Sequence, residues 1–151
     1  MARYLLDTNV VLRFSNPSDS RHSLVVDAVT ALLVEGAECY LTAQVLIELW
    51  VVATRPRNVN GLGWSVEQTS DAITQLLDRF PMADETSQIF RTWLDIVTDN
   101  QVKGKRTHDA RIIAVMLASN ISHILTLNPS DFSSISDIAV VHPQSVLDKS
   151  Y

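Results

Sequence analysis

The chain has 151 residues, of which 46% are hydrophobic and 19% are charged. This length and composition predict a single globular domain over residues 1–151 and exclude a disordered chain. The formal net charge of −5 argues against a protein that grips nucleic acid through a broad basic surface.

The setting of the protein is indicated by one cysteine and by the absence of long apolar runs. Cys39 is the only cysteine, so no internal disulfide can form, which favours a reducing, cytoplasmic location. Asp7 interrupts the first apolar run too early for the core of a signal peptide. No apolar run reaches the length that crosses a bilayer, so we expect no association with a membrane.

The first half of the chain predicts strands that alternate with helices. Residues 4–6 are typical of a buried strand, and a helix is expected to follow the polar group at 7–9. Apolar spacings of three and four predict helices over the longer segments, and short apolar runs predict strands. The expected elements are helix 20–34, strand 38–42, helix 43–54, a helix opened at Ser65 by a capping box with Gln68, and a weak strand at 80–83 that contains a proline.

The second half continues the alternation. Residues 86–99 predict a helix with its apolar residues on one side, namely Ile89, Phe90, Trp93, Leu94 and Val97. A basic loop, an apolar helix and two strands follow at 101–107, 109–119, 122–127 and 138–142, with a turn at 128–132. Strands and helices in alternation predict a parallel sheet covered on both faces, with ligands bound at the carboxyl ends of its strands.

Four acidic residues, Asp7, Glu48, Asp109 and Asp131, follow or begin elements that can converge on one edge of this sheet. Each has an ordinary interpretation when it is taken alone. Asp7 can cap a helix, and Glu48 can lie at the rim of an apolar helix. Asp109 suits the start of a helix, and Asp131 suits a turn. Taken together, they indicate an acidic site.

The chemistry of such a site favours a hard cation. Carboxylates without a cluster of cysteine or histidine select Mg²⁺ or Mn²⁺ rather than zinc. The four histidines show no spacing typical of a structural zinc site. Thr8 and Asn9 are expected to hold the carboxylate of Asp7, and Thr107 is expected to cap the helix of Asp109.

The segments LLDTNV, THDARIIA and LTLNPSDF, with the isolated Glu48 between the first two, resemble the PIN-domain family in order and spacing over nearly the whole chain. The family includes the VapC-type ribonuclease toxins of VapBC toxin–antitoxin pairs. The resemblance implies a three-layer α/β/α fold with a central, mostly parallel sheet of about five strands. It also implies an acidic two-metal pocket that uses Mg²⁺ or Mn²⁺ to hydrolyse RNA, an antitoxin partner and a homodimer.

By the same resemblance, Asp7, Glu48 and Asp109 match the first three acidic residues of the family. The fourth position stays open. Many relatives have an aspartate where this chain has Asn128, and Asp131 follows three residues later. We expect either Asp131 or a water-mediated role for Asn128, whose side chain still offers a carbonyl oxygen.

An acidic pocket that takes RNA needs positive charge nearby. Lys103, Lys105 and Arg106 precede Asp109 and form a candidate RNA-binding cluster, although a charged loop is also what a solvated surface presents. We call these three residues the basic cluster.

Three other functions compete with a nuclease as interpretations of the sequence. A haloacid-dehalogenase-like phosphatase needs a second aspartate where this chain has Asn9. A response-regulator receiver needs an aspartate after a middle strand and a late lysine, which the chain does not supply in those places. A non-catalytic PIN-like module that binds RNA or acts as a scaffold is the stronger alternative, because of Asn128.

Overall fold

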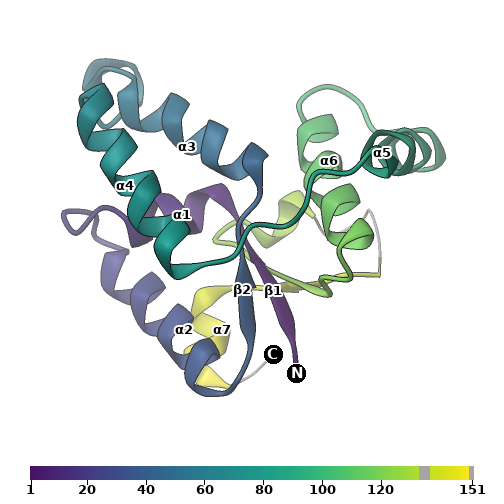
Figure 1. Cartoon of the computed structure of the whole chain (residues 1–151), viewed down its shortest axis with the longest axis horizontal. Coiled ribbons are helices and arrows are strands. Elements are labelled where there is room, and N and C mark those ends of the chain that lie inside the picture. The colour runs from purple at the N-terminus through teal and green to yellow at the C-terminus, as the bar shows by residue number, and fades with distance from the viewer. Residues whose placement is uncertain (133–136, 150–151) are drawn as a thin grey trace.

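A parallel sheet of four strands in the order β2-β1-β3-β4 lies at the centre of the computed structural model, which describes residues 1–132 and 137–149 (Figure 1). The first strand, β1 (Arg3–Leu6), pairs in parallel with both β2 (Glu38–Tyr40) and β3 (His123–Leu125). The edge strand β4 (Ala139–Val141) pairs in parallel with β3. Tyr4, Leu5 and Leu6 are buried, as expected for a central strand that is covered on both faces.

Helices cover both faces of this sheet, which confirms the three-layer α/β/α arrangement. In Figure 1, α2 and α7 pack together on one side of the sheet, and α5 and α6 pack together on the other. Helices α3 and α4 form an arm that extends past the carboxyl ends of the strands. The helices are α1 (Thr8–Phe14), α2 (His22–Val34), α3 (Ala43–Thr54), α4 (Val66–Arg79), α5 (Gln88–Asp99), α6 (Arg106–Ala118) and α7 (Pro143–Asp148), with short 3₁₀ turns at Arg57–Val59 and Pro129–Asp131.

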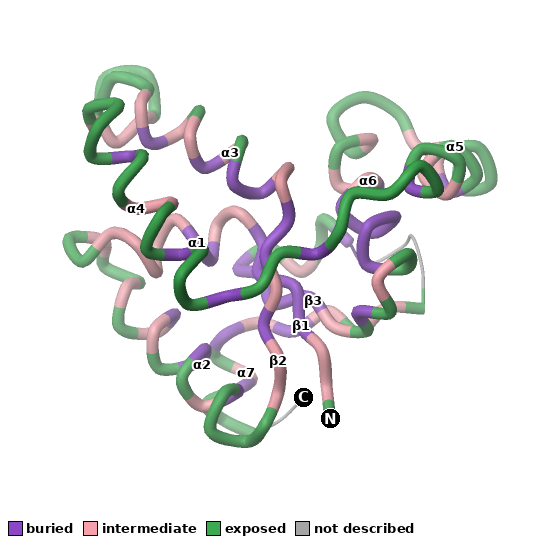
Figure 2. Tube along the Cα trace, viewed as in Figure 1, coloured by how far each residue is buried: buried purple, intermediate pink, exposed green. Residues whose placement is uncertain are grey.

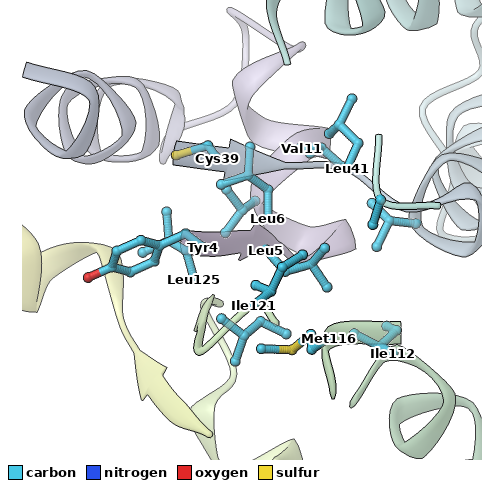
Figure 3. Packing of buried hydrophobic residues seen from close by; sticks show 14 of the residues in the cluster. Tyr4, Leu5, Leu6, Val11, Cys39, Leu41, Ile112, Met116, Ile121 and Leu125 are labelled. Atoms are coloured by element: carbon cyan, nitrogen blue, oxygen red, sulfur yellow. The ribbon is translucent and has the colours of Figure 1, made fainter. Parts of the chain in front are cut away.

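The core is built around β1 and the inner faces of its neighbours (Figure 3). Figure 2 shows buried residues along the strands and on the inner turns of the helices, with exposed residues on the outer turns. Cys39 is a buried member of this core, and burial raises the pKa of its thiol to about 12. Among the described residues, every helix is too short or too polar to traverse a lipid bilayer.

The strand expected at 80–83 is reduced to one parallel bridge between Leu41 and Met82, so the described part of the chain has four strands rather than about five. The pairing consists of Leu41 donating to the Pro81 carbonyl at 2.9 Å and Ala83 donating to the Leu41 carbonyl at 2.8 Å. Pro81 has no N–H with which to extend the ladder. The proline therefore limits the fifth strand to a bridge.

Two expectations for the helices were wrong. Phe90 and Leu94 were expected on the same side of their helix as Ile89, yet Ile89 is buried while 66% of Phe90 and 36% of Leu94 remain exposed. The helix that carries Asp109 begins at Arg106 rather than at Asp109, so Arg106 of the basic cluster lies in the first turn of the helix while Lys103 and Lys105 precede it. The final helix, α7, has a proline near its start and was not expected at all.

Candidate active site

The carboxyl ends of β1 and β3 place Asp7 beside Thr126. The strands pair Leu6 with Leu125, and the ladder continues one step further because the Asp7 N–H donates to the Leu125 carbonyl at 3.0 Å. Asp7 is the residue after β1, and Thr126 is the residue after β3. Both side chains are buried at this edge of the sheet.

The two carboxylate oxygens of Asp7 have different partners. Oδ1 accepts a hydrogen bond from the N–H of Thr8 at 2.8 Å, which caps helix α1. Oδ2 accepts from the Thr126 hydroxyl at 2.7 Å and from Asn9 Nδ2 at 3.3 Å. Asp7 is therefore a helix cap and a fixed carboxylate at the same time, and the two interpretations of this residue are compatible.

Asn9 and Thr126 tie this carboxylate to the next loop. Asn9 Nδ2 lies 3.3 Å from Thr126 Oγ1, and Asn9 Oδ1 accepts from the N–H of Leu127 at 3.0 Å. The Thr126 hydroxyl in turn accepts from the N–H of Asn128 at 3.1 Å. Thr126 was not among the site residues predicted from the sequence. The signal in the sequence is a threonine directly after an apolar strand and two residues before Asn128.

Glu48 reaches the same region from helix α3 and is held by two donors. The Thr8 hydroxyl donates to Oε2 at 2.8 Å, and Gln44 Nε2 donates to Oε1 at 3.0 Å. Gln44 Nε2 also donates to the carbonyl of His108 at 2.8 Å, which joins α3 to the first turn of α6. Gln44 was not among the predicted site residues, although its place one helical turn before Glu48 predicts the contact.

Burial and mutual repulsion raise the pKa values of two of the carboxyl groups. Burial raises the pKa of Asp7 to about 6; hydrogen bonds from Thr126 and Thr8 lower it, and the charges of Glu48 and Asp131 raise it further. Desolvation likewise raises the pKa of Asp109 to about 6, followed by the negative charges of Asp131, Asp7 and Glu48. The four acidic residues therefore form one electrostatically coupled group, which we call the acidic cluster.

The two candidates for the fourth acidic position differ in what the structure shows of them. Asn128 is exposed and is linked to the network through its backbone N–H. Asp131, also exposed, lies in the 3₁₀ turn Pro129–Asp131, and its charge raises the pKa of both Asp7 and Asp109. The electrostatic link to both Asp7 and Asp109 favours Asp131.

The residues that precede Asp109 are arranged differently from the expectation in one respect. Thr107 does not cap the helix, because α6 begins at Arg106 with Lys105 as its N-cap and no side-chain cap bond; the Thr107 hydroxyl donates to the Gly104 carbonyl at 2.7 Å. All three residues of the basic cluster are exposed. The positive charge of Arg106 lowers the pKa of Asp109.

The donor chemistry of the acidic cluster fits a hard divalent cation. Its side chains offer only carboxylate oxygens. The pKa values of Asp7 and Asp109 are raised by burial and then by the negative charges around them, and a bound cation would neutralise those charges. Across residues 1–132 and 137–149, no three His, Cys, Asp or Glu side chains already form a closed ligand set. Mg²⁺ needs only one or two protein carboxylates because it keeps several of its waters.

Comparison with known proteins identifies the family. The PIN domain matches residues 4–138 of the chain. The chain belongs to the PIN domain family. No curated protein sequence matches it. This PIN domain does resemble solved structures throughout its length, so its fold is shared with proteins whose sequences have diverged widely.

Three of these structures illustrate the likeness. DNA-bound VapBC from Salmonella typhimurium has a TM-score of 0.71 at 15% identity, covering 95% of this chain and 99% of that one. VapBC-1 from nontypeable Haemophilus influenzae has a TM-score of 0.67 at 20% sequence identity, and the match covers 94% of this chain and 98% of that one. VapC20 from Mycobacterium tuberculosis is described as a toxin that cleaves the sarcin-ricin loop. It has a TM-score of 0.58 at 16% sequence identity, and the match covers 89% of this chain and 98% of that one.

Proposed function

We propose that this PIN domain is a metal-dependent endoribonuclease and the toxin component of a type II toxin–antitoxin pair. The observation that carries the proposal is the acidic cluster, in which burial raises the pKa values of Asp7 and Asp109 and the negative charges of Glu48 and Asp131 raise both further. The likeness to VapC structures supports the toxin assignment. Cytoplasmic RNA is the proposed substrate, and the cytoplasm is the proposed location of the protein.

Mg²⁺ or Mn²⁺ is proposed as the cofactor, with Asp7 and Asp109 as direct ligands and Glu48 and Asp131 as ligands directly or through water. Such ions supply an activated water and neutralise the charge that develops on the phosphate. The protein residues position the carboxylates. Thr126 and Asn9 hold Oδ2 of Asp7 by hydrogen bonds, and Thr8 and Gln44 hold the carboxylate of Glu48. The two carboxylates therefore lose little conformational entropy when an ion binds.

The proposal predicts cleavage that depends on a divalent cation. The purified protein should cut end-labelled single-stranded RNA in Mg²⁺ or Mn²⁺ and should stop cutting when a chelator removes the ion. Readdition of Mn²⁺ in excess should restore cleavage. Cleavage that persists in the chelator would contradict the proposed chemistry, provided that a mock purification from the same host shows no nuclease.

A non-catalytic PIN module that binds RNA is the second candidate, and Asn128 is the observation in its favour. Such a module would bind RNA in the same assay without cutting it. The charge of Asp131, which acts on both Asp7 and Asp109, argues for the nuclease instead.

The basic cluster provides a second prediction. Replacing Lys103, Lys105 and Arg106 by Ala should weaken RNA binding and flatten its dependence on salt, because fewer counterions are released when the complex forms. All three side chains are exposed, so unfolding should change by less than about 0.5 kcal/mol. Fluorescence anisotropy at several salt concentrations measures the slope. A slope equal to that of the unmodified protein would mean that the loop is only solvated surface.

An antitoxin and a second copy of the chain are the proposed protein partners. Several of the similar solved structures are VapBC complexes, which supports the antitoxin. Trp64 lines a hollow of about 920 Å³ beside α4, a surface on which a peptide of the antitoxin can bury apolar groups. A small DNA-binding protein encoded next to this chain would identify that partner, and light scattering measures the proposed homodimer.

A further inference from the structure

A second hollow lies beside the acidic cluster, between α5 and the first turn of α6. It has a volume of about 390 Å³, and its walls include Ile89, Phe90 and Trp93 of α5 together with His108 and Arg111 of α6. This volume falls in the range of sites that bind small organic groups. We call it the aromatic hollow.

Two aromatic rings dominate its surface. Phe90 is 66% exposed, although it is a large apolar side chain. Its ring centroid lies 5.6 Å from that of Trp93, and the two planes are inclined by 35°. The Trp93 indole is held in place because its Nε1 donates to the carbonyl of Thr107 at 2.8 Å. The aromatic pair is therefore anchored to the turn of α6 that carries Asp109.

The aromatic hollow shares part of its wall with a hollow that reaches Glu48. His108 and Arg111 line it, and the same two residues line a neighbouring hollow of about 340 Å³ whose wall includes Gln44 and Glu48. A chain of nucleotides is an extended molecule that can occupy two neighbouring hollows.

The charges of the two regions differ. None of the described residues that line the aromatic hollow carries a carboxylate. Arg111 is the permanently charged side chain among them; it pairs with Glu85 at 3.1 Å, and its Nη1 lies 3.5 Å from Gln44 Oε1. The hollow therefore suits a flat, uncharged group rather than a phosphate. Single-stranded RNA alternates charged phosphates with uncharged bases, and its bases are recognised by stacking on aromatic side chains.

We propose that the aromatic hollow is a base-binding subsite, in which one nucleobase of the RNA stacks on Phe90 and Trp93 while a neighbouring phosphate lies at the acidic cluster. The inference rests on the proposed nuclease function and adds a specific contact to it. His108 and Thr107 line the hollow and can form hydrogen bonds with the edge of the base. Phe90 thus contributes to substrate affinity, and this role explains why its apolar ring is exposed.

The test uses single-stranded RNA oligonucleotides and variants at Phe90. To keep the RNA intact, every variant is made in an Asp7→Asn parent and bound in Mg²⁺, with RNA integrity checked on a gel. Phe90→Ala should weaken binding about five- to hundredfold, the range found for losing an aromatic ring that stacks on a base. Phe90→Trp should restore binding. Leu77→Ala removes a 44% exposed apolar side chain from α4 and should change nothing.

Two further measurements separate stacking from charge and from general damage. The salt dependence of binding should keep its slope in Phe90→Ala, because stacking releases no counterions. In a series of oligonucleotides that each lack one base, one position should lose affinity for the parent but not for Phe90→Ala. Equal affinity of Phe90→Ala and the parent would overturn the subsite while leaving the nuclease proposal intact.

Light scattering on the same samples tests the competing occupant of the hollow. If Phe90→Ala converts a dimer into a monomer and no abasic position discriminates, the hollow is an interface between copies and the proposal is wrong. If the unmodified protein neither binds nor cleaves RNA, the proposed function fails, and the subsite fails with it.

Discussion

Replacing Asp7 by asparagine is expected to abolish metal-dependent RNA cleavage in a protein that still folds. The carboxylate is buried at the end of β1, and three hydrogen bonds fix its orientation. A neutral amide is a poor ligand for a hard cation. Loss of a group that only supports a metal ligand already costs about 10- to 100-fold. Loss of the ligand itself should therefore reduce cleavage by at least about a hundredfold.

The substitution also separates the two interpretations of Asp7. Asparagine caps helices about as well as aspartate, so a residue that served only as the cap of α1 would tolerate the change without effect on cleavage. Oδ1 of the new amide can still accept from the Thr8 N–H. Its NH₂ group can donate to Thr126 Oγ1, but it meets the donor Nδ2 of Asn9, which costs part of the original network.

A matched control is available on α4. Asp78→Asn removes one negative charge from an exposed position and should leave cleavage unchanged. Cleavage is measured as an initial rate on end-labelled RNA in Mn²⁺, and circular dichroism verifies the fold of each variant. A well-folded Asp7→Asn protein with full activity, free of contaminating nuclease, would show that Asp7 is a cap and nothing more.

The sequence was sufficient for those parts of the fold that depend on local patterns. Helix α3 has the expected bounds, and Ser65 caps α4 by accepting from the Gln68 N–H, because periodicity and capping are encoded within a few residues. The strand at 80–83 was harder to predict, since its formation depended on whether a distant edge at Leu41 could accept a proline-containing partner.

The site was predicted as a set of residue types, but its contacts were not. Adjacent parallel strands bring Asp7 next to β3, which the alternation of elements implies. The hydroxyl of Thr126 and the amide of Gln44 acquire their roles only from tertiary packing, across 119 residues in the bond to Asp7 and across 64 residues in the bond to His108. The exposure of Phe90 is equally non-local, because the helical spacing that places it beside Trp93 is the same for an inner and an outer face.

The raised pKa of Asp7 has a consequence for stability that can be measured without RNA. Its ordinary pKa is 3.8, and burial in the folded protein raises it to about 6. Below about pH 4 the carboxyl is protonated in both states. Between pH 3.8 and about pH 6, Asp7 ionises in the unfolded chain but stays mostly protonated in the folded protein, so the folded protein loses stability as the pH rises. Above about pH 6 the difference between the two pKa values corresponds to a loss of about 3 kcal/mol.

We therefore expect Asp7→Asn to remove most of this pH-dependent loss from the metal-free protein. His123 acts in the opposite direction, because burial lowers its pKa and stability rises as its ring loses its proton. Subtracting the curve of Asp7→Asn from that of the unmodified protein cancels this contribution, together with those of other distant groups. The contribution of Asp109 does not cancel fully, because the charge of Asp7 raises its pKa, but what remains of it lowers stability with rising pH in the same direction as Asp7. The difference in unfolding free energy, measured in urea with a chelator present, should decline between about pH 4 and 6.

Mn²⁺ should reverse the loss. An ion present at a hundred times its dissociation constant stabilises the folded state by about 2.7 kcal/mol, and the effect should shrink toward pH 5 as protons compete for the carboxylates. Asp7→Asn should lose most of the stabilisation by Mn²⁺, whereas Asp78→Asn should keep it. Equal stabilisation by Mn²⁺ in all three proteins would place the ion somewhere other than the acidic cluster. The difference in unfolding free energy between the unmodified protein and Asp7→Asn could instead stay constant from pH 4 to 6. That result would show that burial of the ionised Asp7 does not destabilise the fold, and it would contradict a buried carboxylate that a cation stabilises.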